Sequence, residues 1–213
     1  ISMLLEGIRD TLYMTLVSTL IAYVFGLPLG ILLKVTSKDG LKPNRIIYGI
    51  LDVICNIVRS IPFLILLILL IPFTRLIVGK SYGSTATIVP LVFCAAPYIA
   101  RMVESSLNEV DPGVIEAAKS MGASNFDIVF KVMLVEARTS LIVGATITTG
   151  NILGYSAMSG TVGGGGLGDI AVRYGYYRWQ TDIMIITVIL LIILFQIIQN
   201  IGMKLASSMD KRK

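Results

Sequence analysis

Long apolar runs separated by short polar segments dominate this chain of 213 residues. A helix rises about 1.5 Å per residue, so about 20 apolar residues are needed to cross the hydrocarbon core of a bilayer. Five stretches approach or exceed that length: 12–33, 46–71, 84–100, 139–168 and 183–203. The third reaches bilayer length only if its helix continues to about Met102. The pattern predicts an all-α integral membrane protein with five transmembrane helices.

Composition and charge agree with this prediction. Hydrophobic residues make up 55% of the chain, charged residues 15%, and the mean hydropathy is +0.83, which is too apolar for a soluble domain. Most of the 18 Lys and Arg residues fall after the first span, between the third and fourth spans, and after the fifth. They are Lys34, Lys38, Lys42, Arg45, Arg101, Lys119, Lys131, Arg138, Lys204, Lys211, Arg212 and Lys213.

Loops rich in Lys and Arg stay in the cytoplasm, so we expect the N-terminus outside and the C-terminus inside. The net charge of +5 is thereby explained by membrane topology, and nucleic acid is not an expected partner.

Residues suited to catalysis or metal binding are scarce. The chain has no His, and both cysteines, Cys55 and Cys94, lie in predicted spans, where free thiols are the default. We therefore expect no enzyme activity, no metal and no cofactor on this chain. Because no linker or repeat is visible, residues 1–213 are predicted to form a single transmembrane domain.

The polar segment of about 104–138 predicts a helical hairpin between the third and fourth spans. Asp111 and Pro112 are typical of a helix start, and Gly122 is suited to end that helix in a left-handed conformation. Ser124 and Asp127 have the spacing of a capping box, which predicts a second helix. That helix should carry one apolar face, formed by Phe126, Val129, Phe130 and Met133. From composition alone, such a hairpin could simply lie on the lipid headgroups.

The order of residues in this hairpin resembles a known family. Glu116-Ala117-Ala118, three residues, Gly122, nine residues and Val132-Met133-Leu134 resemble the EAA loop of ABC importer permeases, EAA-x3-G-x9-I-x-L-P. The resemblance implies a coupling helix that docks into a separate ATPase subunit, which would bind ATP and Mg. It assigns the coupling role to Glu116, Ala117, Ala118, Gly122 and Ala123. The chain departs from the pattern with Val132 in place of Ile and Val135 in place of Pro.

Further segments narrow the resemblance to the permease subunit of methionine importers. They are 59–63 (RSIPF), 96–104 (APYIARMVE) and 154–158 (GYSAM), followed by 163–168 (GGGGLG). This likeness implies a multi-pass permease in a bacterial inner membrane, formed by two copies of the chain among membrane lipids. Two ATPase subunits would lie beneath the pair, and an external methionine-binding protein or lipoprotein above it.

Several residues inside the spans have two open interpretations. Arg59 either faces an aqueous cavity, a partner or the membrane edge, or it pairs with Asp52 two helical turns away. Pro62 and Pro97 are expected to kink their helices. The pairs Gly26/Gly30 and Gly150/Gly154 have the spacing that permits close helix crossing.

The glycine run at 163–168 contains G-x-G-x-x-G, but no strand precedes it and the P-loop lysine is missing, so we do not expect this chain to bind ATP. We expect instead a flexible external loop. Tyr155 and Met158 come just before it, and together with Arg59 they are candidates for a pore or gate, with simple packing as the alternative.

Taken with the resemblance, the sequence predicts the permease subunit of an ATP-driven importer that moves methionine inward by alternating access. A permease for another small amino acid is the first alternative. An ion-coupled secondary transporter is the second; it should show inverted repeats or carboxylates inside the spans, where Asp52 alone lies deep.

Overall fold

The computed structural model describes residues 2–209, which are mostly helical and contain no β-strand. Within these residues, four helical stretches are long and apolar enough to cross a membrane. They are α1 (Ser2–Thr36), α5 (Ser84–Asn108), the stretch Arg138–Tyr176 that begins with α9 (Arg138–Met158), and α11 (Thr181–Met209). The predicted all-α membrane fold is therefore confirmed. Lys211, Arg212 and Lys213, which the charge pattern assigns to the cytoplasm, lie outside the described residues.

The second predicted span is broken rather than continuous. It consists of α2 (Arg45–Ser60) and α3 (Phe63–Leu69), whose axes meet at 102°, and α4 (Ile71–Val78) follows. Pro62 has no backbone N–H and forces Ile61 into an extended conformation, which ends α2. Five crossings result only if this bent pair counts as one. Pro97 lies inside α5 and, unlike Pro62, does not end its helix.

Close packing of α1 against α5 forms the centre of the bundle. A Cβ atom at Gly26 would lie 2.7 Å from the Cβ of Ile99, and one at Gly30 would lie 2.6 Å from the Cβ of Val103. Real Cβ atoms do not approach so closely, so both positions need glycine. The predicted helix crossing at this glycine pair is confirmed.

Of the second glycine pair, Gly150 and Gly154, only Gly150 lies at a close helix crossing. A Cβ atom at Gly150 would lie 2.8 Å from the ring of Phe195, so this glycine lets α9 and α11 approach each other. At Gly154, no atom lies within 4 Å of the added Cβ. Gly154 therefore faces away from the rest of the chain.

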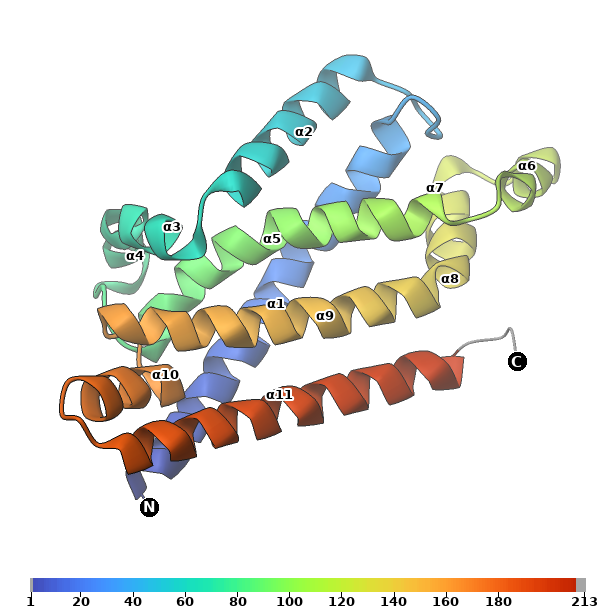
Figure 1. Ribbon diagram of the computed structural model, residues 1–213. Coiled ribbons are helices and arrows are strands. Elements are labelled where there is room, and N and C mark those ends of the chain that lie inside the picture. Colours follow the sequence, from blue (N-terminus) through green and yellow to red (C-terminus); the bar gives the residue numbers. More distant parts are fainter. Residues whose placement is uncertain (1, 210–213) are drawn as a thin grey trace.

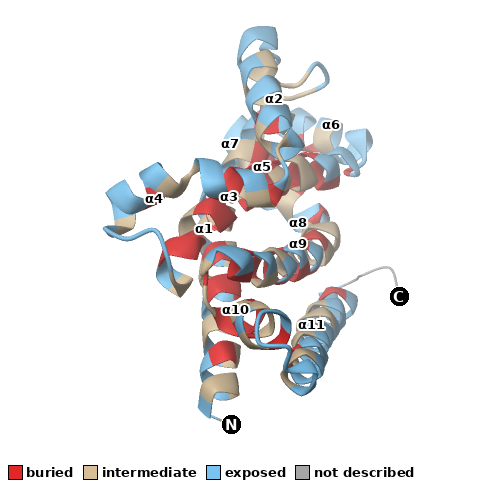
Figure 2. Cartoon of the chain, turned by 60° about the vertical axis from the view of Figure 1, so that its left-hand side comes forward, coloured by how far each residue is buried: buried red, intermediate tan, exposed pale blue. Residues whose placement is uncertain are grey.

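The outer surface of the bundle is apolar. Figure 2 shows buried residues gathered on α1, α5, α9 and α10, whereas α2, α4 and α11 are mostly exposed or intermediate. On α11, large exposed side chains such as Ile185, Ile192 and Ile201 point away from the bundle, and only Thr187 and Ala206 are buried. An apolar exterior of this extent is stable in lipid and not in water.

The glycine-rich segment is not the flexible external loop that the sequence predicts. After α9 the chain passes through a 3₁₀ turn (Ser159–Val162), the short helix α10 (Gly166–Ile170) and a π-helical segment (Ala171–Tyr176). Gly164, Gly166 and Gly168 are buried. The hydroxyl of Thr11 accepts a hydrogen bond from the N–H of Leu167 at 2.9 Å. A Cβ atom at Gly166 would lie 2.7 Å from the hydroxyl of Thr11, so this glycine lets the start of α10 pack on α1. Side chains at Gly164 and Gly168 would instead collide with Ser159 and with Ala157 at the end of α9.

Figure 1 shows the polar hairpin around α6 (Pro112–Ser120) at one end of the bundle, near the α1–α2 loop. The N-terminus, α3, α4 and α10 lie at the opposite end. The hairpin thus projects from a single end, where it is accessible to a partner.

Candidate coupling surface and transport pathway

Local capping interactions fix the helix α6. The carboxylate of Asp111 accepts a hydrogen bond from the N–H of Gly113 at 2.7 Å, and Pro112 occupies the first helical position. At the other end, Gly122 has a φ of +81°. The N–H of Ala123 then donates to the carbonyl of Ala118 at 3.1 Å, which closes the turn. Both predicted ends of this helix are confirmed.

The five residues of the predicted coupling surface do not share one face. Glu116, Ala117 and Gly122 are exposed, whereas Ala118 is buried and Ala123 is half-buried against the core. Ala118 and Ala123 therefore attach the hairpin to the bundle. Glu116, Ala117 and Gly122 form part of its free surface.

The sequence interpretation missed an exposed apolar residue at the tip. Met121 is 82% exposed, and Val114 and Ala117 precede it at helical spacing on the same side of α6. A large apolar side chain this exposed at a polar end of the molecule is typical of a surface that a partner covers. The i, i+3, i+7 spacing of these residues is present in the sequence, but spacing alone does not show which side of a short helix is exposed.

The helix after Ser124 differs from the single apolar face that was predicted. It is formed by α7 (Asn125–Asp127), a π-helical segment (Ile128–Met133) and α8 (Leu134–Glu136). Val129 and Met133 are buried, but Phe126 and Phe130 are exposed, with ring centroids 4.4 Å apart. The π-helical turns have more than 3.6 residues each, and the apolar positions therefore divide between two faces.

The predicted capping box at the start of α7 is present. The hydroxyl of Ser124 accepts from the N–H of Asp127 at 3.1 Å and donates to its carboxylate at 2.5 Å. The ammonium of Lys131, 2.5 Å away, and then the Ser124 hydroxyl hold the pKa of Asp127 below its usual range. These contacts orient the second half of the hairpin.

Basic residues from two separate loops meet beside α6. A cleft of 1240 Å³ lies between the α1–α2 loop, the end of α5 and α6. Lys34, Lys38, Arg45 and Lys119 line it together with Glu104 and Glu116. The ammonium of Lys34 donates to the side-chain oxygen of Asn108 at 2.6 Å, which links the ends of α1 and α5. The two Lys- and Arg-rich segments thus lie on the same end of the bundle.

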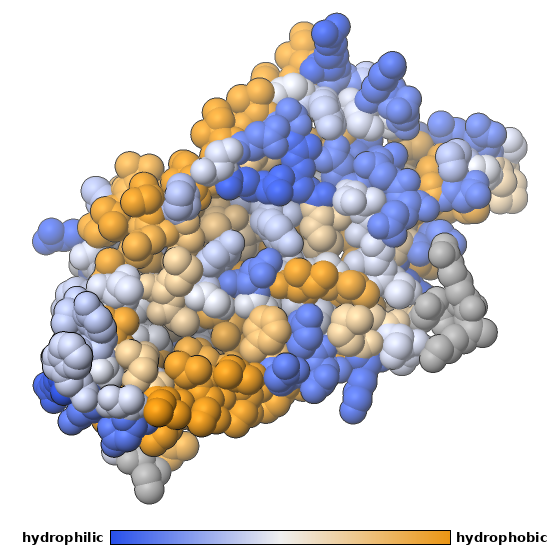
Figure 3. Space-filling view, viewed as in Figure 1, coloured by the Kyte–Doolittle hydropathy of each residue, from blue (hydrophilic) through white to orange (hydrophobic). Residues whose placement is uncertain are grey.

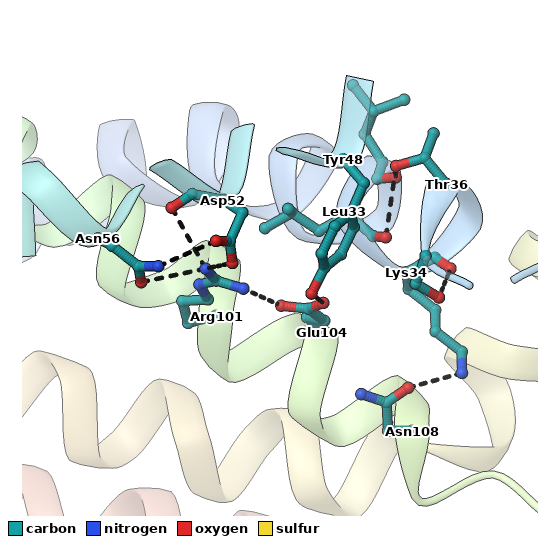
Figure 4. Close-up of polar contacts among 11 residues, drawn as sticks. Leu33, Lys34, Thr36, Tyr48, Asp52, Asn56, Arg101, Glu104 and Asn108 are labelled. Atoms are coloured by element: carbon teal, nitrogen blue, oxygen red, sulfur yellow. Dashed lines mark hydrogen bonds and ion pairs between the residues drawn. The ribbon is translucent and has the colours of Figure 1, made fainter. Parts of the chain in front are cut away.

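A polar network joins α2 to α5 (Figure 4). The guanidinium of Arg101 donates to the carboxylates of Asp52 and Glu104, the latter at 2.8 Å, and to the side-chain oxygen of Asn56 at 3.1 Å. The hydroxyl of Tyr48 donates to Glu104 at 3.0 Å. Glu104 is only 8% exposed, and these contacts compensate for the burial of its charge.

The network decides one of the open interpretations. Asp52 binds Arg101 and not Arg59, so of the two interpretations of Arg59 the pairing with Asp52 is wrong. Arg101, which the sequence places in a cytoplasmic loop, lies inside α5. Arg59 is exposed, and its guanidinium carbon lies 5.9 Å from the centroid of the Tyr98 ring.

Tyr155 and Met158 occupy the last turn of α9 in different environments. The ring of Tyr155 stacks on that of Phe63, the first residue of α3, with centroids 4.9 Å apart. Met158 is 46% exposed and lies on the same side of α9 as Asn151 and Gly154, which are also exposed. Tyr155 thus packs inside the chain, and Met158 faces outward.

The apolar exterior and the exposed apolar tip at one end define a membrane-embedded protein with a surface suited to a partner at that end. Residues 26–205 match the family of binding-protein-dependent transport system inner membrane components. The chain belongs to that family, and it is a multi-pass protein of the inner membrane.

Individual relatives are similar over nearly the whole chain. The probable D-methionine transport system permease protein MetI of Vibrio cholerae is 48% identical over 210 residues, which cover 99% of this chain and 93% of that protein. The methionine import system permease protein MetP of Bacillus subtilis is 46% identical, with 85% of this chain and 82% of that protein covered. A solved chain from inward-facing conformations of the MetNI methionine ABC transporter is 47% identical, with a TM-score of 0.97 over 99% of this chain and 98% of that chain.

Proposed function

We propose that this chain is the permease subunit of an ATP-driven importer that moves methionine inward by alternating access. The proposal rests on the comparisons with known proteins. The chain belongs to the family of inner membrane transport components, and the relatives that align with it over most of their length are named as methionine permeases. Two copies of the chain form the pathway, and an external binding protein delivers the substrate. The covalent chemistry takes place on a separate ATPase pair, which binds ATP and Mg.

The tip of α6 docks onto the ATPase. The exposed residues Glu116, Ala117 and Gly122 form the contact together with Met121, and Ala118 and Ala123 hold the hairpin on the bundle. Closure of the ATPase pair would move the two hairpins together and thereby shift α5 and α9. Such a two-state movement needs a stiff connection, and the caps at both ends of α6 supply it.

The chain forms one transmembrane domain, 1–213, with the coupling loop at about 104–138. The hairpin and the C-terminus lie in the cytoplasm, and the N-terminus lies outside. The cleft where Lys34, Lys38, Arg45 and Lys119 meet supports this orientation, because Lys- and Arg-rich segments remain cytoplasmic.

The candidate pathway residues have different roles. Met158 faces away from its own chain and is suited to form an apolar gate with the second copy. Tyr155 supports the α2–α3 break through its stacking on Phe63. Arg59 lies on the other side of that break and faces the pathway.

The first test is native mass spectrometry of the complex purified through a tag on this chain. Two copies of the chain with two copies of one ATPase are expected. This chain alone, or an oligomer without ATPase after mild extraction, would favour an ion-coupled transporter instead. Uptake by proteoliposomes that also contain the binding protein then identifies the substrate. Uptake of another small amino acid in place of methionine would overturn the assignment of methionine and retain the importer.

A further inference from the structure

The helix α2 has two clearly different sides. Its large exposed apolar side chains gather on one side and include Ile46, Ile50, Val53 and Ile57. Asp52, Asn56 and Arg59 follow one another at helical spacing on the opposite side. Figure 3 shows hydrophilic surface over α2 toward α5, next to hydrophobic surface on the outer side. The apolar side therefore faces lipid, and the polar side faces away from it.

Arg59 lies deep along this polar side. It is in the last turn of α2, about 21 Å along the helix from Arg45 at a rise of about 1.5 Å per residue. With the bent pair α2–α3 counted as one crossing of a hydrocarbon core about 30 Å thick, Arg59 lies next to the bend between its two halves and therefore within the membrane. A charged residue at such a depth faces a water-filled cavity or a partner group.

The guanidinium of Arg59 is available to a ligand. Within residues 2–209 it takes part in no hydrogen bond or ion pair, and the neighbouring carboxylate of Asp52 is occupied by Arg101. Its guanidinium carbon lies 5.9 Å from the centroid of the Tyr98 ring. Contact with a ring face leaves the N–H donors of a guanidinium free at its edge.

The end of α2 supplies complementary chemistry next to Arg59. The break at Ile61 and Pro62 leaves the last carbonyls of α2 without helical partners, and Ile61 takes up only that of Val58. Free carbonyls at a helix C-terminus attract a positive charge. The guanidinium can thus bind an anion, and the free carbonyls can bind a cation. The Tyr98 ring adds an aromatic surface beside them.

We propose that Arg59 binds the α-carboxylate of the amino acid in transit, with its α-ammonium toward the carbonyl end of α2. A thioether side chain would then lie against the aromatic ring, a contact that sulfur favours. This inference rests on the proposed function and adds a substrate-binding residue to it. A carboxylate of the second copy or a lipid phosphate would offer the same oxyanion chemistry to Arg59, and the experiment separates these sources.

The experiment measures the reaction of Arg59 with phenylglyoxal in the complete complex in nanodiscs, without nucleotide or binding protein. Peptide mass spectrometry reports the rate at Arg59. Arg178 is the internal control, because it is also stacked on a tyrosine, with its guanidinium 4.6 Å from the Tyr174 ring. L-Methionine at about ten times its Kd should slow the reaction at Arg59 about tenfold, because only the free fraction reacts. L-Methioninamide, which has no carboxylate, should not slow it, and Arg178 should be unaffected.

Three results would overturn the proposal. The first is an equal rate at Arg59 with and without methionine. The second is an Arg59 that is unreactive in nanodiscs and reactive in a phosphate-free detergent, which assigns it to a lipid phosphate. The third is an Arg59 that is unreactive in both, which assigns it to the second copy. If the wild-type complex imports methionine in any of these cases, the binding inference fails and the proposed function stands. If that complex fails to import methionine, the proposed function fails.

Variants provide a second readout. Arg59→Gln should lower methionine uptake at least about tenfold with the complex still assembled, because charge-assisted hydrogen bonds to a carboxylate are lost. Arg59→Lys should retain part of the uptake that Arg59→Gln loses, because the positive charge remains but bidentate hydrogen bonding to a carboxylate does not. Arg178→Gln is the matched control and should transport normally. Wild-type uptake by Arg59→Gln would contradict the proposal.

Discussion

Asp52 on α2 is bound by Arg101 on α5, although Arg59 lies on the same face of its own helix. This ion pair, together with Glu104, attaches the broken helix α2 to the central helix α5 (Figure 4). It also leaves the charge of Arg59 free for another partner. In our proposal, one arginine therefore stabilises the bundle and the other binds the substrate.

Loss of the Arg101 guanidinium should destabilise the bundle. In Arg101→Gln the nearly buried Glu104 loses its ionic partner, and breaking such a partly buried network costs about 2–4 kcal/mol. Thermal unfolding of the purified complex, followed through this chain, should show a lower midpoint. Lys131→Gln is the control, because its exposed i,i+4 pair with Asp127 contributes little to stability. Equal midpoints for the two variants would contradict the structural role of Arg101.

Gly122→Asp should separate the permease from its ATPase and still permit membrane insertion. The variant places a carboxylate at the free surface of the hairpin, in a left-handed position that disfavours side chains. Uptake should fall at least about tenfold, which corresponds to about 1.4 kcal/mol or more of docking free energy.

Gly79→Asp is the matched control for this variant. Gly79 has a φ of +80°, ends α4 and, like Gly122, has open space around an added Cβ. The backbone strain is therefore the same, but the position lies at the opposite end of the bundle from α6. If both variants lose the ATPase in native mass spectrometry to the same degree, strain and not docking is the cause.

Met121 should contribute to ATPase docking through its apolar side chain. Burying a methionine stabilises an interface by about 1.5–3 kcal/mol, and a glutamate in its place would remain solvated. Met121→Glu should therefore weaken ATPase binding, whereas Met121→Leu should retain it. The dissociation constant, measured by titrating the purified ATPase onto the permease in nanodiscs, checks this. Unchanged affinity in Met121→Glu would show that the partner leaves this side chain exposed.

Gly30→Ala should disturb the contact between α1 and α5. The added Cβ would lie 2.6 Å from the Cβ of Val103, and overpacking of this kind costs about 1–3 kcal/mol. Gly49→Ala on α2 meets no atom within 4 Å and should be neutral or slightly stabilising, since alanine favours helix more than glycine. Unfolding midpoints of the two variants in the same detergent compare these effects directly. A neutral Gly30→Ala would mean that α1 can move away from α5 without cost.

Several features were predictable because they depend on neighbours within a few residues. The long helices follow from apolar runs, the ends of α6 from Asp111, Pro112 and Gly122, and the start of α7 from Ser124 and Asp127. The position of the α2–α3 break follows from Pro62, although its 102° angle does not. Capping and helix termination are local events, so the order of residues determines them.

The order of residues is sufficient to predict the all-α membrane fold, the hairpin after α5 and the family resemblance. Three features required the three-dimensional structure: Arg101 and not Arg59 binds Asp52, Met121 is exposed, and the glycine run packs on α1. These outcomes depend on which helices lie next to each other. Arg101 is 49 residues from Asp52 along the chain, and Leu167 is 156 residues from Thr11. No local periodicity specifies such partners, because packing free energy is shared among all the helices that meet in the bundle.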